Sequence, residues 1–172
     1  MVLYFLRHGL AGQHGDPKYK NDSLRPLTAP GKEKIHTAAL GMQTLGISFD
    51  AILSSPYLRA RQTAEIVAQA YTIKNKSIHL TNNLLPPALF ATLLNEVQSL
   101  FAKSEHILFV GHEPHLSDMI SSLLDCPQPL RIDFKKGALC CLEITQDPKN
   151  PDAYLKWFLT STQLSLLAKE KE

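Results

Sequence analysis

Short apolar runs that alternate with helical patterns constrain most strongly what this chain can fold into. The runs at residues 2–6, 49–53 and 106–110 are rich in β-branched and aromatic side chains, which is typical of buried strands. Helices are expected over residues 28–46, 57–71, 88–102 and 114–124. This alternation predicts an α/β fold in three layers, with a mostly parallel central sheet between two layers of helices.

The last third of the chain has a different pattern, with strands that follow one another closely. Residues 130–134 and 138–144 are expected to form a hairpin around Lys135–Gly137, and residues 154–160 a further strand before a short helix at 163–169. A weak strand is also expected at 78–80. These strands predict an antiparallel edge on the parallel sheet. The length of 172 residues suits a single domain over residues 1–172.

Charge and composition narrow the classes of partner. A net charge of +2 is too small for a general nucleic-acid or membrane binder, so any functional positive charge must act locally. The three cysteines show neither metal-ligand spacing nor a disulfide framework, which indicates free thiols in a reducing compartment. No segment approaches the length of a membrane span, and the first apolar run lacks the basic leader of a signal peptide. We therefore expect a cytoplasmic protein.

Reactive and cationic side chains follow the three strongest strands, at the point where each strand ends. Arg7 and His8 follow the first strand, Arg59 follows the second, and His112 follows the third. Because the carboxyl ends of parallel strands meet at one edge of a sheet, these side chains should share a crevice. Such a cluster repels itself unless an anion lies within it, and arginine matches the oxygens of a phosphoryl group with paired hydrogen bonds. The sequence therefore predicts a phosphate site.

The histidines suggest a reaction at that site. Neighbouring cations favour the neutral form of an imidazole, and a neutral imidazole is a nucleophile that can attack phosphorus and carry it as phosphohistidine. The second imidazole can then donate a hydrogen bond to the phosphoryl oxygens as charge develops on them.

Simpler interpretations exist for each residue taken alone. Arg59 and Arg61 can be solvated charges on a helix surface, and His112 can cap a helix. A metal site is not expected, because Pro114 between His112 and His115 disfavours a rigid pair of ligands. The remaining histidines are expected at the surface or in loops: His14, His36, His79, His106 and His115.

The ordered set of motifs resembles the histidine phosphatase (phosphoglycerate mutase-like) superfamily. The motifs are Leu6–Gly9, Arg25–Thr28 with Gly31, Ser54–Ala64 and Val110–Pro114. The short chain and the segments 136–138 and 157–160 resemble the SixA-type phosphohistidine phosphatases.

This resemblance implies a phosphoglycerate mutase-like fold and an enzyme that needs no cofactor and no metal. It implies His8 as the nucleophile and His112 as the second histidine beside the phosphoryl group. Arg7 and Arg59 would bind phosphate, and Arg25 would reach the rim of the pocket. Arg61 lies outside the matched position and is expected at the surface.

One departure from the family pattern bears on the substrate. Many members that cleave phosphate esters place an acidic residue after the weak strand, whereas residues 84–89 contain no carboxylate. An alkoxide leaving group needs a proton, but a phosphorylated imidazole can depart as neutral imidazole. Unless Glu113 or Asp16 supplies the acid, the missing group favours a nitrogen–phosphorus bond in the substrate.

We therefore expect a phosphohistidine phosphatase that removes phosphate from a histidine-phosphorylated protein through phospho-His8. Two alternatives stay open. One is a phosphomonoesterase that acts on a small phosphorylated molecule, and the other is a phosphate-binding module without enzymatic activity.

Overall fold

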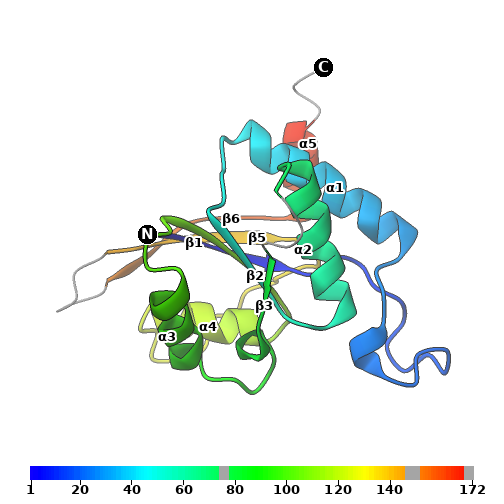
Figure 1. The fold of residues 1–172 in the computed structure, drawn as a ribbon, viewed down its shortest axis with the longest axis horizontal. Helices are drawn as coiled ribbons and strands as arrows, with labels where there is room; N and C mark the ends of the chain where they lie inside the picture. Colours follow the sequence, from blue (N-terminus) through cyan, green and yellow to red (C-terminus); the bar gives the residue numbers. More distant parts are fainter. Residues whose placement is uncertain (74–77, 146–151, 169–172) are drawn as a thin grey trace.

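A six-stranded sheet lies between two layers of helices in the computed structural model of the chain, which describes residues 1–73, 78–145 and 152–168 (Figure 1). The strands, in the spatial order β3-β2-β4-β1-β5-β6, are β1 (Val2–Arg7), β2 (Ala51–Ser54), β3 (Ile78–Leu80), β4 (His106–Gly111), β5 (Leu139–Ile144) and β6 (Ala153–Leu159). The first four are parallel to one another, and β5 and β6 pair antiparallel at the edge beyond β1. The predicted mostly parallel sheet with an antiparallel edge is confirmed.

Helices cover both faces of the sheet, which confirms the three layers (Figure 1). One face carries α1 (Ala29–Thr44), α2 (Leu58–Ala70) and α5 (Ser161–Ala168), and the other carries α3 (Phe90–Leu100) and α4 (His115–Leu123). Two short 3-10 turns, η1 (Asp22–Leu24) and η3 (Asn82–Leu84), complete the described elements. Successive side chains of β1 alternate between the two apolar clusters, because neighbouring residues of a strand point to opposite faces. None of the described helices is long and apolar enough to cross a membrane.

The start of α1 is formed by a capping side chain and a proline in the first turn. Thr28 Oγ1 accepts a hydrogen bond of 3.1 Å from the backbone N–H of Gly31, and Pro30 occupies the first turn. Further along the helix, Gly41 allows α1 to touch α5 closely, because a Cβ at this position would overlap the backbone carbonyl of Leu164. The amino end of α1 is thus fixed by its cap and the middle by contact with α5.

The predicted hairpin at 130–144 is wrong in its first strand. Residues 130–134 form no strand, whereas β5 occupies the expected place of the second. The reason is that β5 pairs with β1 on one side and with β6 on the other, which leaves no free edge for a further partner. The segment instead runs along the α4 side of the sheet, where Phe134 is buried in the apolar cluster.

Candidate active site

The ends of three neighbouring strands form the floor of the candidate site. The backbone N–H of His8 donates to the carbonyl of Gly111 (3.0 Å), and that of Ser55 donates to the carbonyl of Val110 (2.9 Å). These hydrogen bonds continue the sheet beyond the strands and hold the three junctions together. As a result the rings of His8 and His112 lie 5.1 Å apart, centroid to centroid, and both are buried. The structure thus brings together the two histidines that the sequence singled out.

The hydrogen bonds of His8 define its tautomer. Nδ1 lies 2.7 Å from the carbonyl oxygen of Gly9, which can only accept, so Nδ1 carries the proton. Nε2 accepts a hydrogen bond of 3.3 Å from Arg59 Nε, so Nε2 carries a lone pair. The ring therefore presents an unprotonated nitrogen beside a guanidinium, as a nucleophile for phosphorus requires.

The surroundings of His8 keep it neutral. Burial lowers the pKa of His8 to about 2, and the neighbouring His112 ring and the charges of Arg59 and Arg7 act in the same direction. The hydrogen bond to the Gly9 carbonyl opposes them but is outweighed. The imidazole is therefore neutral throughout the physiological pH range.

The turn after β1 is held by α2 and α1. The N–H of Gly9 donates to Thr63 Oγ1 (3.0 Å), and this hydroxyl donates to the backbone carbonyl of Arg59 (2.7 Å). A Cβ at Gly9 would lie 2.7 Å from Ile35 Cγ1, so only glycine allows this close approach to α1. Sequence reasoning missed Thr63, although it faces the site four residues after Arg59, one helical turn further on.

Ser55 orients His112. Ser55 Oγ accepts a hydrogen bond of 3.3 Å from the N–H of Tyr57, so its own proton can go to His112 Nε2, 2.7 Å away. Nδ1 of His112 then carries the ring proton, and it is buried without a hydrogen-bond partner in the described part of the chain. Burial, assisted by the charge of Arg59, lowers the pKa of His112 to about 3. His112 is therefore a neutral donor without an acceptor.

Arg7 leaves a second donor unsatisfied. Its Nη1 donates to the backbone carbonyl of Phe134 (2.6 Å), within the segment that was expected to be a strand. Its Nε is buried and has no partner among the described residues. Lys136 follows two residues after Phe134. Partial desolvation of its ammonium, with the charges of Arg7 and two further arginines, lowers the pKa of Lys136. Cationic groups thus gather around one small space.

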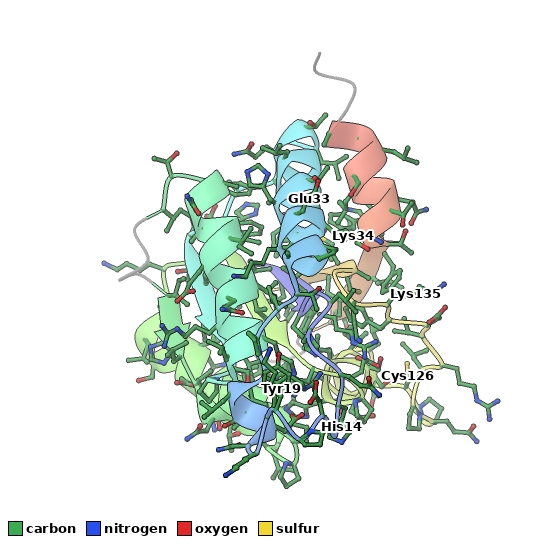
Figure 2. All side chains as sticks on the ribbon, turned by 90° about the vertical axis from the view of Figure 1, so that its right-hand side faces the viewer. His14, Tyr19, Glu33, Lys34, Cys126 and Lys135 are labelled. Atoms are coloured by element: carbon green, nitrogen blue, oxygen red, sulfur yellow. The ribbon has the colours of Figure 1, made fainter. Side chains whose placement is uncertain are left out.

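Asp22, which sequence reasoning missed, balances part of this charge. Its carboxylate forms an ion pair with Arg59 (Nη1 to Oδ2, 3.0 Å) and accepts a hydrogen bond from Arg25 Nε (2.9 Å). Burial alone would raise the pKa of Asp22, but the hydrogen bonds from His14 and Arg25 and the charge of Arg59 hold that pKa well below its usual range. The loop between β1 and α1, which contains the η1 turn, lies beyond the carboxyl end of β1 at the right of Figure 1, and Figure 2 looks onto this loop.

Arg25 lies deeper than the rim position expected for it. Its side chain is buried, with Nη1 donating to the carbonyl of Gly12 (2.7 Å) while Nε reaches Asp22. Asp22 therefore joins Arg25 to Arg59. A cluster of cationic side chains at neighbouring strand ends needs a negative charge to balance it. The one sequence signal for Asp22 in this role was its position three residues before Arg25.

Glu113 and Asp16, the two carboxylates that could replace the missing acid, make hydrogen bonds to residues close to them in the sequence. Glu113 accepts hydrogen bonds from the N–H (3.1 Å) and the hydroxyl (2.6 Å) of Ser117, in the first turn of α4. Burial raises the pKa of Glu113 despite these bonds. Asp16 Oδ1 accepts a hydrogen bond from the N–H of Lys18 (2.9 Å). Within the described residues, neither carboxylate makes a hydrogen bond to His8 or His112.

Other polar residues agree only in part with expectation. Arg61 is exposed and pairs with Glu65 (2.8 Å), as expected for a surface charge. His115, expected at the surface, is buried, because the first turn of α4 packs against η3 and brings Nε2 within 3.3 Å of the carbonyl of Asn83. Among the described residues, no three histidine, cysteine or acidic side chains are grouped to hold a metal ion.

The chain is similar to known proteins both by family model and by sequence. Residues 3–84 match the family model of the histidine phosphatase superfamily (branch 1). An uncharacterized protein of Picosynechococcus sp. (strain PCC 7002) is 34% identical over 140 residues, which cover 81% of this chain and 82% of that protein. A shorter stretch of 70 residues is 38% identical to "Probable phosphoglycerate mutase GpmB" of Escherichia coli, with 41% of this chain and only 32% of that protein covered.

A solved structure of the protein histidine phosphatase SixA in complex with tungstate has a similar fold. Its TM-score is 0.79 at 24% sequence identity, with 95% of this chain and 99% of that chain covered. At this identity the comparison supports the phosphoglycerate mutase-like fold, and the chemistry must be argued from the side chains.

Proposed function

The chain belongs to the histidine phosphatase superfamily and is a phosphatase, and we propose that its substrate is phosphohistidine carried by a protein. The name of the solved SixA neighbour, a protein histidine phosphatase, agrees with this substrate class. Under this proposal Arg7 and Arg59 bind the phosphoryl group, His8 attacks it and His112 donates a hydrogen bond to it.

The observation that carries the proposal is the pair of unsatisfied donors beside the His8 nucleophile. Arg7 Nε and His112 Nδ1 are buried without partners in the described part of the chain. Leaving a polar group in this state costs about 1–3 kcal/mol, so such groups are rare unless a ligand completes them. A phosphoryl group has enough oxygens to accept from both donors while its phosphorus faces His8 Nε2.

The first chemical step follows from the His8 tautomer. The lone pair of Nε2 forms a bond to phosphorus, and the bond between phosphorus and the substrate's imidazole breaks. The electron pair of that bond stays on the departing nitrogen. Because the other nitrogen of the departing ring keeps its proton, the product is neutral imidazole. The proton of His8 stays on Nδ1 throughout, hydrogen-bonded to the Gly9 carbonyl oxygen.

The second step returns the enzyme to its starting state. Water forms a bond to the phosphorus of phospho-His8, the bond to Nε2 breaks, and the proton of the water goes to the phosphate product or to solvent. His112 and the two arginines stabilise the charge on the phosphoryl oxygens in both steps. Neither step needs a carboxylic acid, in agreement with the positions of Glu113 and Asp16.

The test compares kcat/KM on a histidine-phosphorylated protein with kcat/KM on simple phosphomonoesters. We expect the phosphohistidine substrate to be preferred and His8→Ala to abolish turnover, while His36→Ala, on the exposed face of α1, keeps it. Radiolabelled substrate should transfer an acid-labile, base-stable label to the wild-type chain and none to the His8→Ala variant.

Two results would replace the proposal by the alternatives. Clearly faster hydrolysis of esters would identify a small-molecule phosphomonoesterase. Binding of tungstate without turnover of any phosphorylated compound would identify a phosphate-binding module.

A further inference from the structure

We propose that Asp22 forms a leaving-group subsite, in which its carboxylate accepts a hydrogen bond from the protonated ring nitrogen of the departing imidazole. The inference rests on the proposed function and concerns the half of the substrate that the phosphate contacts do not touch. It makes Asp22 a determinant of specificity for nitrogen–phosphorus bonds.

A short path through the guanidinium of Arg59, one hydrogen bond and one ion pair long, links the nucleophile to this carboxylate. His8 Nε2 is 3.3 Å from Arg59 Nε, and Nη1 of the same guanidinium is 3.0 Å from Asp22 Oδ2. Arg59 Nη1 also donates to the backbone carbonyl of Asp22 (2.9 Å), so the η1 turn is fixed on the guanidinium at two points. One arginine side chain therefore separates the reacting nitrogen from the Asp22 carboxylate.

The two oxygens of Asp22 are not equally occupied. Oδ1 accepts from His14 Nδ1 (2.9 Å) and Arg25 Nε (2.9 Å), which uses both of its lone pairs. Oδ2 lies 3.0 Å from Arg59 Nη1 in an ion pair, and it accepts no hydrogen bond from another side chain among the described residues. The Asp22 side chain is 36% exposed. The oxygen closest to the phosphate-binding arginine thus keeps an acceptor position that a ligand can reach.

The protonation state of Asp22 determines which kind of group can occupy this acceptor position. Its hydrogen bonds and the neighbouring arginine hold the pKa of Asp22 well below its usual range, so the group accepts protons in hydrogen bonds and does not supply them. An N–H donor is therefore attracted, whereas a departing alkoxide oxygen is repelled and receives no proton. A phosphorylated imidazole carries such an N–H, on the nitrogen away from phosphorus, when its ring is protonated.

The contact also favours the reactive form of the substrate. An anionic carboxylate beside the imidazole N–H stabilises the protonated ring. If that proton were lost, the leaving group would depart as an imidazolate anion, which is a much poorer leaving group. Asp22 would hold the proton in place while the nitrogen–phosphorus bond breaks, without being protonated itself.

A role restricted to orienting Arg25 and Arg59 is the competing explanation, and it predicts a different result. Both phosphohistidine and ester substrates need the arginines, so loss of orientation would reduce kcat/KM equally for both. Loss of a leaving-group contact would reduce it for phosphohistidine alone. The ratio of the two values therefore separates the two roles.

The experiment measures this ratio for wild type, Asp22→Asn and the matched control Asp16→Asn. Asp16 lies in the same loop, and its carboxylate accepts a hydrogen bond from the backbone N–H of Lys18, two residues further on. The substrates are phosphohistidine on a carrier protein and p-nitrophenyl phosphate, whose departing oxygen bears no N–H. Asp22→Ser also removes the charge and replaces Asp22→Asn if that variant does not fold.

We expect Asp22→Asn to lower the ratio of kcat/KM on phosphohistidine to kcat/KM on the aryl phosphate by about 10- to 100-fold, the range for a hydrogen bond to a charged group. The alkaline limit of the phosphohistidine pH profile should also move to lower pH, because the substrate proton is held less tightly. Asp16→Asn should keep the wild-type ratio.

An unchanged ratio in Asp22→Asn, with equal losses on both substrates, would overturn the inference and leave the proposed function standing. Absence of wild-type activity on phosphohistidine, with activity on the aryl phosphate retained, would instead overturn the proposed function.

Discussion

The two buried neutral histidines should make the stability of this protein strongly dependent on pH. In the folded chain the pKa of His8 is about 2 and that of His112 about 3, mainly because both rings are buried. In the unfolded chain an ordinary histidine has a pKa of about 6.5. Between these values the unfolded chain binds protons that the folded chain refuses, so the free energy of unfolding must fall as the pH falls.

The size of the effect follows from the same difference. Moving from about pH 7 to about pH 5 should cost about 2 kcal/mol for each of the two histidines, since one pH unit corresponds to about 1.4 kcal/mol per proton. The variant His8→Gln cannot take up a proton at this position. Its free energy of unfolding should therefore fall by about 2 kcal/mol less than that of wild type over the same interval.

Urea unfolding at a series of pH values measures this difference. The buffers must be free of phosphate, because a bound anion would raise the pKa of both histidines and hide the effect. His36→Gln, with its side chain exposed on α1, is the comparison variant. If wild type and His8→Gln lose stability in parallel, His8 takes up a proton freely in the folded state, and the account of a neutral nucleophile must be abandoned.

Three substitutions test other parts of the structure. Gly41→Ala should lower the free energy of unfolding by about 1–3 kcal/mol in urea titrations, because its methyl group overlaps the Leu164 carbonyl; full stability would show that α1 and α5 can separate. Ser55→Ala removes the donor to His112 Nε2 and should lower kcat about tenfold with an unchanged circular dichroism spectrum; an unaltered kcat would show that the tautomer does not matter. Arg59→Lys should weaken inhibition by inorganic phosphate at least about tenfold, because an ammonium cannot replace the planar fork; equal inhibition would exclude Arg59 from phosphate binding.

The parts of the fold that the sequence predicted are those with strong local signals. The strands β1, β2 and β4 are apolar runs buried on both faces, and each ends at a polar junction, so both the sheet and the convergence of His8, Arg59 and His112 could be inferred. Thr28 and Pro30 marked the start of α1 because capping depends only on nearby residues.

The parts that failed depend on contacts between distant segments. Residues 130–134 have the composition of a strand, but whether a strand forms depends on a free neighbouring edge, and β6 occupies the outer edge of β5. Asp22 lies in a polar loop with no periodic pattern, and its importance follows from the arginine that α2 brings to it. Such pairings are visible only once the chain is folded.

The position of β1 inside the sheet has a consequence for how the protein is made. β1 is synthesised well before its partners, because it pairs with β4 and β5, whose residues follow it by more than about 100 positions. Contacts of such long range form slowly, and an apolar strand that waits for them is exposed to aggregation. A nascent chain that still lacks β5 would therefore leave one edge of the apolar strand β1 unpaired, next to the nucleophile His8, until β5 has been made.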